Sequence, residues 1–168
     1  AHPRLRHFHG YAESANAGDV GAFFDQSPMI GLANPLAPPI TIAQSGERSA
    51  IASVTFGSAY EGPPGSLPGG FVAATFDEVL GFVRSLGGNP GMTGTLTIRY
   101  RRPTPLHTEL IIEGELLRIR GRKIFTEGRI LADGVVTAEA EGLFISIDAS
   151  KMEVLLKARQ DYESTRDN

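Results

Sequence analysis

The fold of this chain is decided by the stretch Gly62-Pro63-Pro64-Gly65-Ser66-Leu67-Pro68-Gly69-Gly70-Phe71-Val72-Ala73-Ala74-Thr75-Phe76-Asp77-Glu78-Val79-Leu80-Gly81, in which a turn-rich loop runs directly into a mostly apolar helix. Gly69 and Gly70 leave backbone N–H groups uncovered at the helix start, where the aligned peptide dipoles favour negative charge. Asp77 follows two turns later, and a carboxylate is costly to bury in an apolar helix. The stretch therefore predicts an oxyanion site together with a base.

Length and composition set the outer limits. The 168 residues fit one ordinary domain, and a net charge of −3 gives no polyanion-binding signature, so we expect no nucleic-acid partner. We also expect no membrane partner, because no apolar run approaches the roughly 20 residues that span a bilayer. The chain has no cysteine, which excludes a disulfide framework and a thiolate zinc site. We expect no metal and a cytoplasmic location.

The pattern along the chain predicts three parts. Residues 1–38 are expected to form an N-terminal helix (11–26) and a proline-rich loop, residues 39–148 the main domain, and residues 149–168 a short helix with a disordered tail. The main helix is predicted from Gly69 to Leu86, because Gly87, Gly88 and Pro90 form a strong stop signal. The predicted strands are Ile40–Gln44, Ala50–Phe56, Thr93–Arg101, Glu109–Arg120, Arg122–Ala132 and Val135–Ile147. One helix on a meander of antiparallel strands is an α+β layer arrangement.

Helical geometry separates the two acids of the main helix. Successive residues are rotated by about 100° around the helix axis. This rotation places an apolar stripe on one side of the helix, and Asp77 on a separate strip of small residues. The stripe consists of Val72, Phe76, Val79, Leu80 and Val83. Glu78 is rotated further and is expected to be solvated or ion-paired. Phe71 and Phe82 lie nearly opposite the stripe, so the helix is expected to be buried almost all round. Because Asp77, and not Glu78, lies on the strip of small residues, Asp77 is the candidate catalytic acid.

The quoted stretch, followed by Gly91-Met92-Thr93-Gly94-Thr95-Leu96-Thr97-Ile98-Arg99-Tyr100-Arg101-Arg102-Pro103-Thr104-Pro105-Leu106, resembles the hotdog-fold acyl-CoA thioesterases. More narrowly, it is similar to the phenylacetate-pathway and human THEM-type branch, over about 34–147. The resemblance implies an antiparallel sheet wrapped around a long central helix. It also implies homodimers that join their sheets edge to edge, often paired into tetramers, with two active sites at the interface. The substrate would be an acyl-CoA thioester, with no other cofactor.

The resemblance also implies roles for individual residues. The family motif is His-Gly-Gly followed by an acid, which maps the backbone donors to Gly69 and Gly70 and the acid to Asp77. Thr93 matches a hydroxyl that helps to position the attacking water. Pro68 occupies the place of the motif histidine and offers neither a donor nor a charge. The resemblance leaves open whether Asp77 acts as a general base or as a nucleophile.

Other interpretations stay open at this point. The basic residues Arg101, Arg102, Arg122 and Lys123 would suit the phosphates of coenzyme A, or they are solvated charges at strand ends. In a purely structural role, Asp77 would instead be a buried acid that pairs with Arg84 or a backbone donor. For the whole chain, the alternatives are an acyl-CoA binding or sensing protein that has lost the motif histidine, and a hotdog hydratase. The hydratase is disfavoured because His107, expected at the surface, has no dehydratase spacing.

Overall fold

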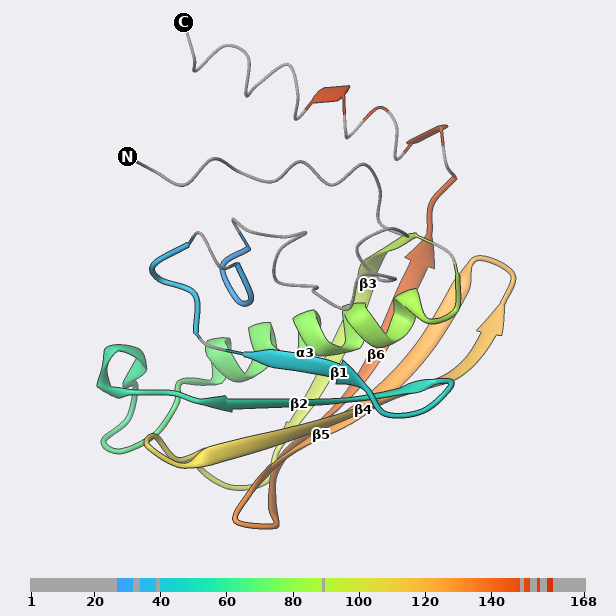
Figure 1. Cartoon of the computed structure of the whole chain (residues 1–168). Helices are drawn as coiled ribbons and strands as arrows, with labels where there is room; N and C mark the ends of the chain where they lie inside the picture. The colour runs from blue at the N-terminus through green and yellow to red at the C-terminus, as the bar shows by residue number, and fades with distance from the viewer. Residues whose placement is uncertain are drawn as a thin grey trace, which may run out of the picture.

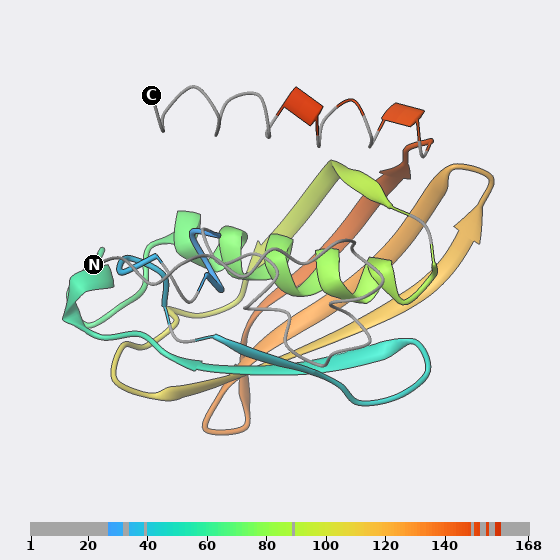
Figure 2. The same ribbon diagram turned by 45° about the horizontal axis from the view of Figure 1, so that its top comes forward.

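A six-stranded antiparallel sheet curves around one long helix (Figures 1 and 2). The computed structural model describes residues 27–31, 34–38, 40–88, 90–148, and 150, 151, 154, 157 and 158. The strand order is β1-β2-β4-β5-β6-β3, and every neighbouring pair is antiparallel. The elements are β1 (Thr41–Gln44), β2 (Ser49–Thr55), the 3-10 helix η1 (Ser58–Tyr60), α3 (Gly69–Ser85), β3 (Gly91–Tyr100), β4 (Glu109–Arg120), β5 (Lys123–Ala132) and β6 (Val135–Ser146). The α+β architecture implied by the resemblance is confirmed.

Tight turns connect the central strands. Asp133 and Gly134 have φ angles of 48° and 75°, the pair of positive values that a two-residue type I′ hairpin requires. The predicted Asp-Gly turn is therefore confirmed. The β4–β5 turn differs from expectation, because Arg122 lies in the turn with Gly121 (φ 57°) and β5 begins only at Lys123. The remaining strand and helix ends differ from the prediction by two residues or fewer.

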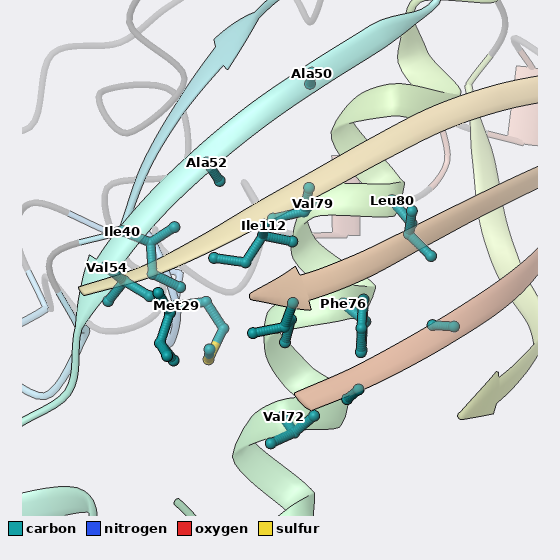
Figure 3. Packing of buried hydrophobic residues seen from close by; sticks show 14 of the residues in the cluster. Met29, Ile40, Ala50, Ala52, Val54, Val72, Phe76, Val79, Leu80 and Ile112 are labelled. Carbon is teal, nitrogen blue, oxygen red and sulfur yellow. The ribbon is translucent and has the colours of Figure 1, made fainter. Parts of the chain in front are cut away.

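The core lies between α3 and the inner face of the sheet. All five residues of the predicted stripe, Val72, Phe76, Val79, Leu80 and Val83, are buried. Figure 3 shows this side of the helix facing the small side chains of β2 and Ile112 of β4. Two glycines let the helix approach closely, because a Cβ at Gly114 or Gly128 would lie 2.9 or 3.1 Å from a side chain of α3. The opposite side of α3 is less buried than expected, since Phe71 and Phe82 are only half-buried.

The two edges of the sheet differ in length. β1 has 4 residues, whereas β3 has 10 residues and pairs with β6 along one side only. Regular alternation along the last strand predicts Thr137 on the polar face with Glu139 and Glu141. The register between β5 and β6 is irregular there, so Thr137 is buried instead, and its hydroxyl donates to the Ile130 carbonyl at 3.3 Å. The expected helix over 11–26 and the tail beyond residue 158 lie outside the described residues.

Candidate active site

The two side chains predicted for the site, Asp77 and Thr93, are in contact. Thr93 Oγ1 on β3 donates a hydrogen bond of 2.7 Å to Asp77 Oδ1 on α3. Both side chains are exposed on the protomer surface beside the free edge of β3. The interpretation of Asp77 as a buried acid is wrong for the protomer, because the carboxylate is open to solvent. A hydroxyl bonded to one carboxylate oxygen leaves the other oxygen available to a water molecule or a substrate.

A β-bulge at Gly94 aims Thr93 at the helix. Thr93 pairs with Phe144 and Thr95 with Leu143, so Gly94 has no partner on β6. Side chains alternate between the faces of a strand, so Thr93 and Thr95 would share a face in a regular strand. The extra residue turns Thr93 to the helix side and leaves Thr95 on the outer face. The sequence analysis did not predict this β-bulge, although a glycine inside a strand, here between two threonines, is a signal for one.

The start of α3 presents two open backbone donors. Pro68 is the N-cap, makes no side-chain cap, and its carbonyl accepts from the N–H groups of Phe71 and Val72. Within the described part of the chain, the N–H groups of Gly69 and Gly70 make no hydrogen bond. A Cβ at Gly70 would have no atom within 4 Å. The predicted donors are thus exposed at the positive end of the helix dipole, with free space in front of Gly70.

Distance along the helix separates these donors from the acid. Gly70 and Asp77 are seven positions apart. At 1.5 Å per residue they lie about 10 Å apart along the axis, on the same side of the helix. A thioester carbonyl carbon and its oxygen are joined by one bond of about 1.2 Å. The Gly70 N–H and the Asp77 carboxylate of one protomer are therefore much farther apart along the helix than the carbonyl group they would both act on.

Glu78 differs from its expected state. It is half-buried, and its Oε2 accepts a hydrogen bond of 3.2 Å from the Ser27 hydroxyl. Burial raises the pKa of this carboxyl, the Ser27 hydroxyl lowers it by less, and the nearby Asp77 raises it further. Because Glu78 is covered by the segment that begins at Ser27, it is not the solvated residue that the sequence suggested. It does not lie on the side of Asp77 that is open to a substrate.

The four predicted phosphate-binding residues form two separate pairs. Arg101 and Arg102 follow the end of β3, and Arg101 donates to Glu139 Oε2 at 2.6 Å. Arg122 and Lys123 lie at the β4–β5 turn, beside Ser146 at the other end of β6. Since β6 runs the length of the sheet between them, the structure does not bring all four together in one protomer. All four side chains are exposed.

Three further observations concern His107, metal ligands and membrane-spanning helices. His107 is exposed, has a φ of 56°, and its Nε2 lies 3.0 Å from the Ser58 hydroxyl. No group of three or more metal-ligating side chains occurs among the described residues. None of the helices in the described ranges has the length and apolar character needed to cross a bilayer.

Comparison with known families agrees with this geometry. The family model described as the thioesterase superfamily matches residues 65–139, which include α3, β3 and both candidate site residues Asp77 and Thr93. The crystal structure of a thioesterase superfamily protein superposes with a TM-score of 0.68 and 43% identity, over 71% of this chain and 62% of that chain. Over the region that holds α3, β3 and the candidate site, this chain is therefore similar to the thioesterase superfamily.

Particular relatives are similar over part of their length. The acyl-coenzyme A thioesterase THEM4 of Bos taurus is 34% identical over 107 residues, which are 62% of this chain and 44% of that protein. This chain thus spans less than half the length of that curated relative. A hypothetical thioesterase from Streptococcus pneumoniae, solved with coenzyme A, shares the fold with a TM-score of 0.60 and 18% identity, over 64% of this chain and 87% of that chain.

Proposed function

We propose that this protein hydrolyses acyl-CoA thioesters to a free acid and coenzyme A. The observation that carries the proposal is the exposed Asp77 carboxylate, held by the Thr93 hydroxyl beside the free edge of β3. The similarity to acyl-coenzyme A thioesterase THEM4 supports the choice of substrate. The cytoplasmic location and a role in lipid metabolism stay predictions.

In the proposed reaction, Asp77 removes a proton from a water molecule as the water oxygen attacks the thioester carbonyl carbon. The carbonyl oxygen gains negative charge and is stabilised by the Gly70 N–H at a helix start. The tetrahedral intermediate collapses, the C–S bond breaks, and the proton reaches the departing sulfur. Direct attack by the Asp77 carboxylate would instead form an anhydride that water then hydrolyses. Thr93 orients the carboxylate in either route.

We further propose that the site is shared between two protomers. The separation of about 10 Å along the helix axis between Gly70 and Asp77 in one chain favours a donor from a second protomer. Antiparallel pairing of β3 with the β3 of a second copy would continue the sheet and satisfy the free backbone groups of this long edge. It would also place the Arg101 end of one protomer next to the Arg122 end of the other. Joined in this way, the two basic pairs would serve the phosphates of coenzyme A.

The first experiment measures release of free thiol from a panel of acyl-CoA esters. Asp77→Asn is expected to lower kcat by about 10²–10⁴, the usual contribution of a positioned base. Asp133→Asn is the matched control, because it makes the same change in an exposed turn where Asn also adopts positive φ. Wild-type turnover that survives in Asp77→Asn would contradict the role of Asp77.

The second experiment tests the shared site by mixing two inactive variants. Gly70→Pro removes the N–H donor, and Asp77→Asn removes the base. In a mixed dimer with a shared site, one site carries both changes and the other carries neither. Random association of equal amounts should thus restore about a quarter of wild-type activity. No restoration after subunit exchange, checked with differently tagged protomers, would place both groups in one chain.

The alternative function is binding or sensing of an acyl-CoA without turnover. Pro68 favours it, because the N-cap supplies no side-chain donor next to the carbonyl site. Micromolar binding of the esters with no thiol release from any of them would establish the binding protein instead of the enzyme. In that case Pro68→His would be expected to create turnover, whereas an unchanged rate in an active wild type would show that no histidine is needed there.

A further inference from the structure

Tyr100, the last residue of β3, contacts the first residue of α3 in two ways. Its hydroxyl donates a hydrogen bond of 2.9 Å to the Gly69 carbonyl. Its ring occupies the space beside the Gly69 Cα, where a Cβ would lie 3.2 Å from the hydroxyl oxygen and 3.3 Å from Cζ. The surroundings of the two glycines therefore differ. Gly69 makes room for Tyr100, whereas Gly70 faces open space.

The carbonyl that accepts this bond belongs to the same peptide group as the Gly70 N–H. A hydrogen bond to a peptide oxygen fixes the plane of the peptide, and it also makes the N–H on the other side a stronger donor. Such cooperative strengthening is about 10–30% per bond. Tyr100 thus acts on the Gly70 donor through one amide plane, without approaching the place where a carbonyl would bind.

No other side chain in the described ranges hydrogen-bonds this peptide. Pro68 makes no side-chain cap, and the first turn of α3 contains no acidic residue. A pair of glycines has more conformational freedom than any other dipeptide, so holding the Gly69–Gly70 peptide in one orientation at the first turn of α3 costs more entropy. The phenol restrains this freedom from a neighbouring strand.

β3 therefore contacts both the proposed catalytic acid and the proposed oxyanion-donor peptide. Thr93, on the helix side of β3, contacts Asp77 at 2.7 Å, and Tyr100 contacts Gly69 at 2.9 Å. β3 is also the free edge of the sheet. A second strand that pairs with β3 would therefore lie next to both the Asp77 carboxylate and the Gly69–Gly70 peptide.

We propose that Tyr100 is a positioning residue for the oxyanion donor, orienting and polarising the Gly69–Gly70 peptide through its hydroxyl. This role rests on the proposed hydrolytic function. Tyr100 is assigned no contact with the substrate, so the effect should appear in kcat while KM changes little. Removing one neutral hydrogen bond of this kind is expected to lower kcat by roughly three- to tenfold.

Tyr100→Phe tests the proposal, because it removes the hydroxyl and keeps the ring beside Gly69. Tyr60→Phe is a matched control, since the Tyr60 hydroxyl also donates to a backbone carbonyl, that of Leu36, at 2.9 Å. For each variant we would measure kcat and KM for the best ester, and the amide proton shift of Gly70 by NMR without ligand. In Tyr100→Phe we expect a lower kcat, an unchanged KM and an upfield Gly70 shift. In Tyr60→Phe we expect none of these changes.

The outcomes separate this proposal from the proposed function. An active wild type with unchanged kcat in Tyr100→Phe would overturn the positioning role and leave the hydrolytic function intact. An equal loss of kcat in both variants would also overturn it, because the cause would then be general destabilisation. If the wild type hydrolyses no ester, the proposed function fails. The Gly70 shift would still decide the peptide contact, and an unchanged shift would refute it.

Discussion

The two sides of α3 place neighbouring carboxylates in opposite surroundings. Asp77 faces the open edge strand β3, is exposed, and bonds Thr93. Glu78 is covered by the segment Ser27–Gly31, bonds Ser27, and has a raised pKa because of its burial. Both residues are acids on one helix, so the covering chain determines what each can do. The open side is suited to chemistry, and the covered side contributes to stability.

The largest effect on stability is expected from the covered side. Met29 and Ile30 in the covering segment are each 5% exposed and belong to the main core. Met29→Ala should lower the free energy of unfolding by about 2–5 kcal/mol, because it removes buried methylenes and leaves a cavity. Chemical denaturation measures this loss. A change below about 0.5 kcal/mol would mean that the segment does not cover this side of α3 in solution.

On the open side, Thr93→Val should mainly change activity. The variant keeps the size of the side chain and removes the hydrogen bond to the Asp77 carboxylate. Hydrogen bonds to charged groups contribute about 1.5–3 kcal/mol, which corresponds to a roughly 10–100-fold fall in kcat/KM. Thr93→Ser is the matched control, because it retains the hydroxyl. Equal rates for the Val and Ser variants would show that the hydroxyl does not position Asp77.

A smaller loss is expected for Ser27→Ala. The Ser27 hydroxyl donates to Glu78 and accepts from the backbone N–H groups of Met29 and Ile30. Its removal should lower the free energy of unfolding by about 0.5–1.5 kcal/mol and leave the thioesterase rate unchanged. Thermal or chemical unfolding together with the thiol-release assay provides both readings. Lower activity in a fully folded Ser27→Ala protein would remove the functional difference between the two sides.

The pH dependence of stability gives the smallest and most specific effect. The folded-state pKa of Glu78 lies above its ordinary value of 4.5. Between these two pKa values, the folded protein keeps a proton on Glu78 that the unfolded chain has already lost. This contribution is present below about pH 4.5 and is lost as the pH rises through the folded pKa. Glu78→Gln stays neutral throughout. Its gain in stability over wild type should therefore be larger at pH 7 than at pH 4, as measured by denaturation at both pH values.

The sequence predicted the local features accurately where local rules apply. The Asp-Gly hairpin, the end of α3 and the apolar stripe of the helix follow from turn chemistry and helical periodicity. The choice of Asp77 over Glu78 as the catalytic acid also came from periodicity, and it stays a prediction. These features depend on residues that are close in the chain.

Tertiary structure decided the features that depend on distant residues. The bulge at Gly94 and the contacts of Thr93 and Tyr100 with α3 arise from the register of β3 against β6 and from how the helix lies on the sheet. Burial under distant parts of the chain raises the pKa of Glu78, and the hydrogen bond from Ser27, 51 positions away, lowers it by less. Sequence periodicity indicates which face of an element a side chain occupies, but a hydrogen-bond partner is set by the packing of elements far apart in the chain. The sequence alone thus predicted the fold and the candidate acid Asp77, and only the three-dimensional structure showed that one strand, β3, contacts both Asp77 and the start of its helix.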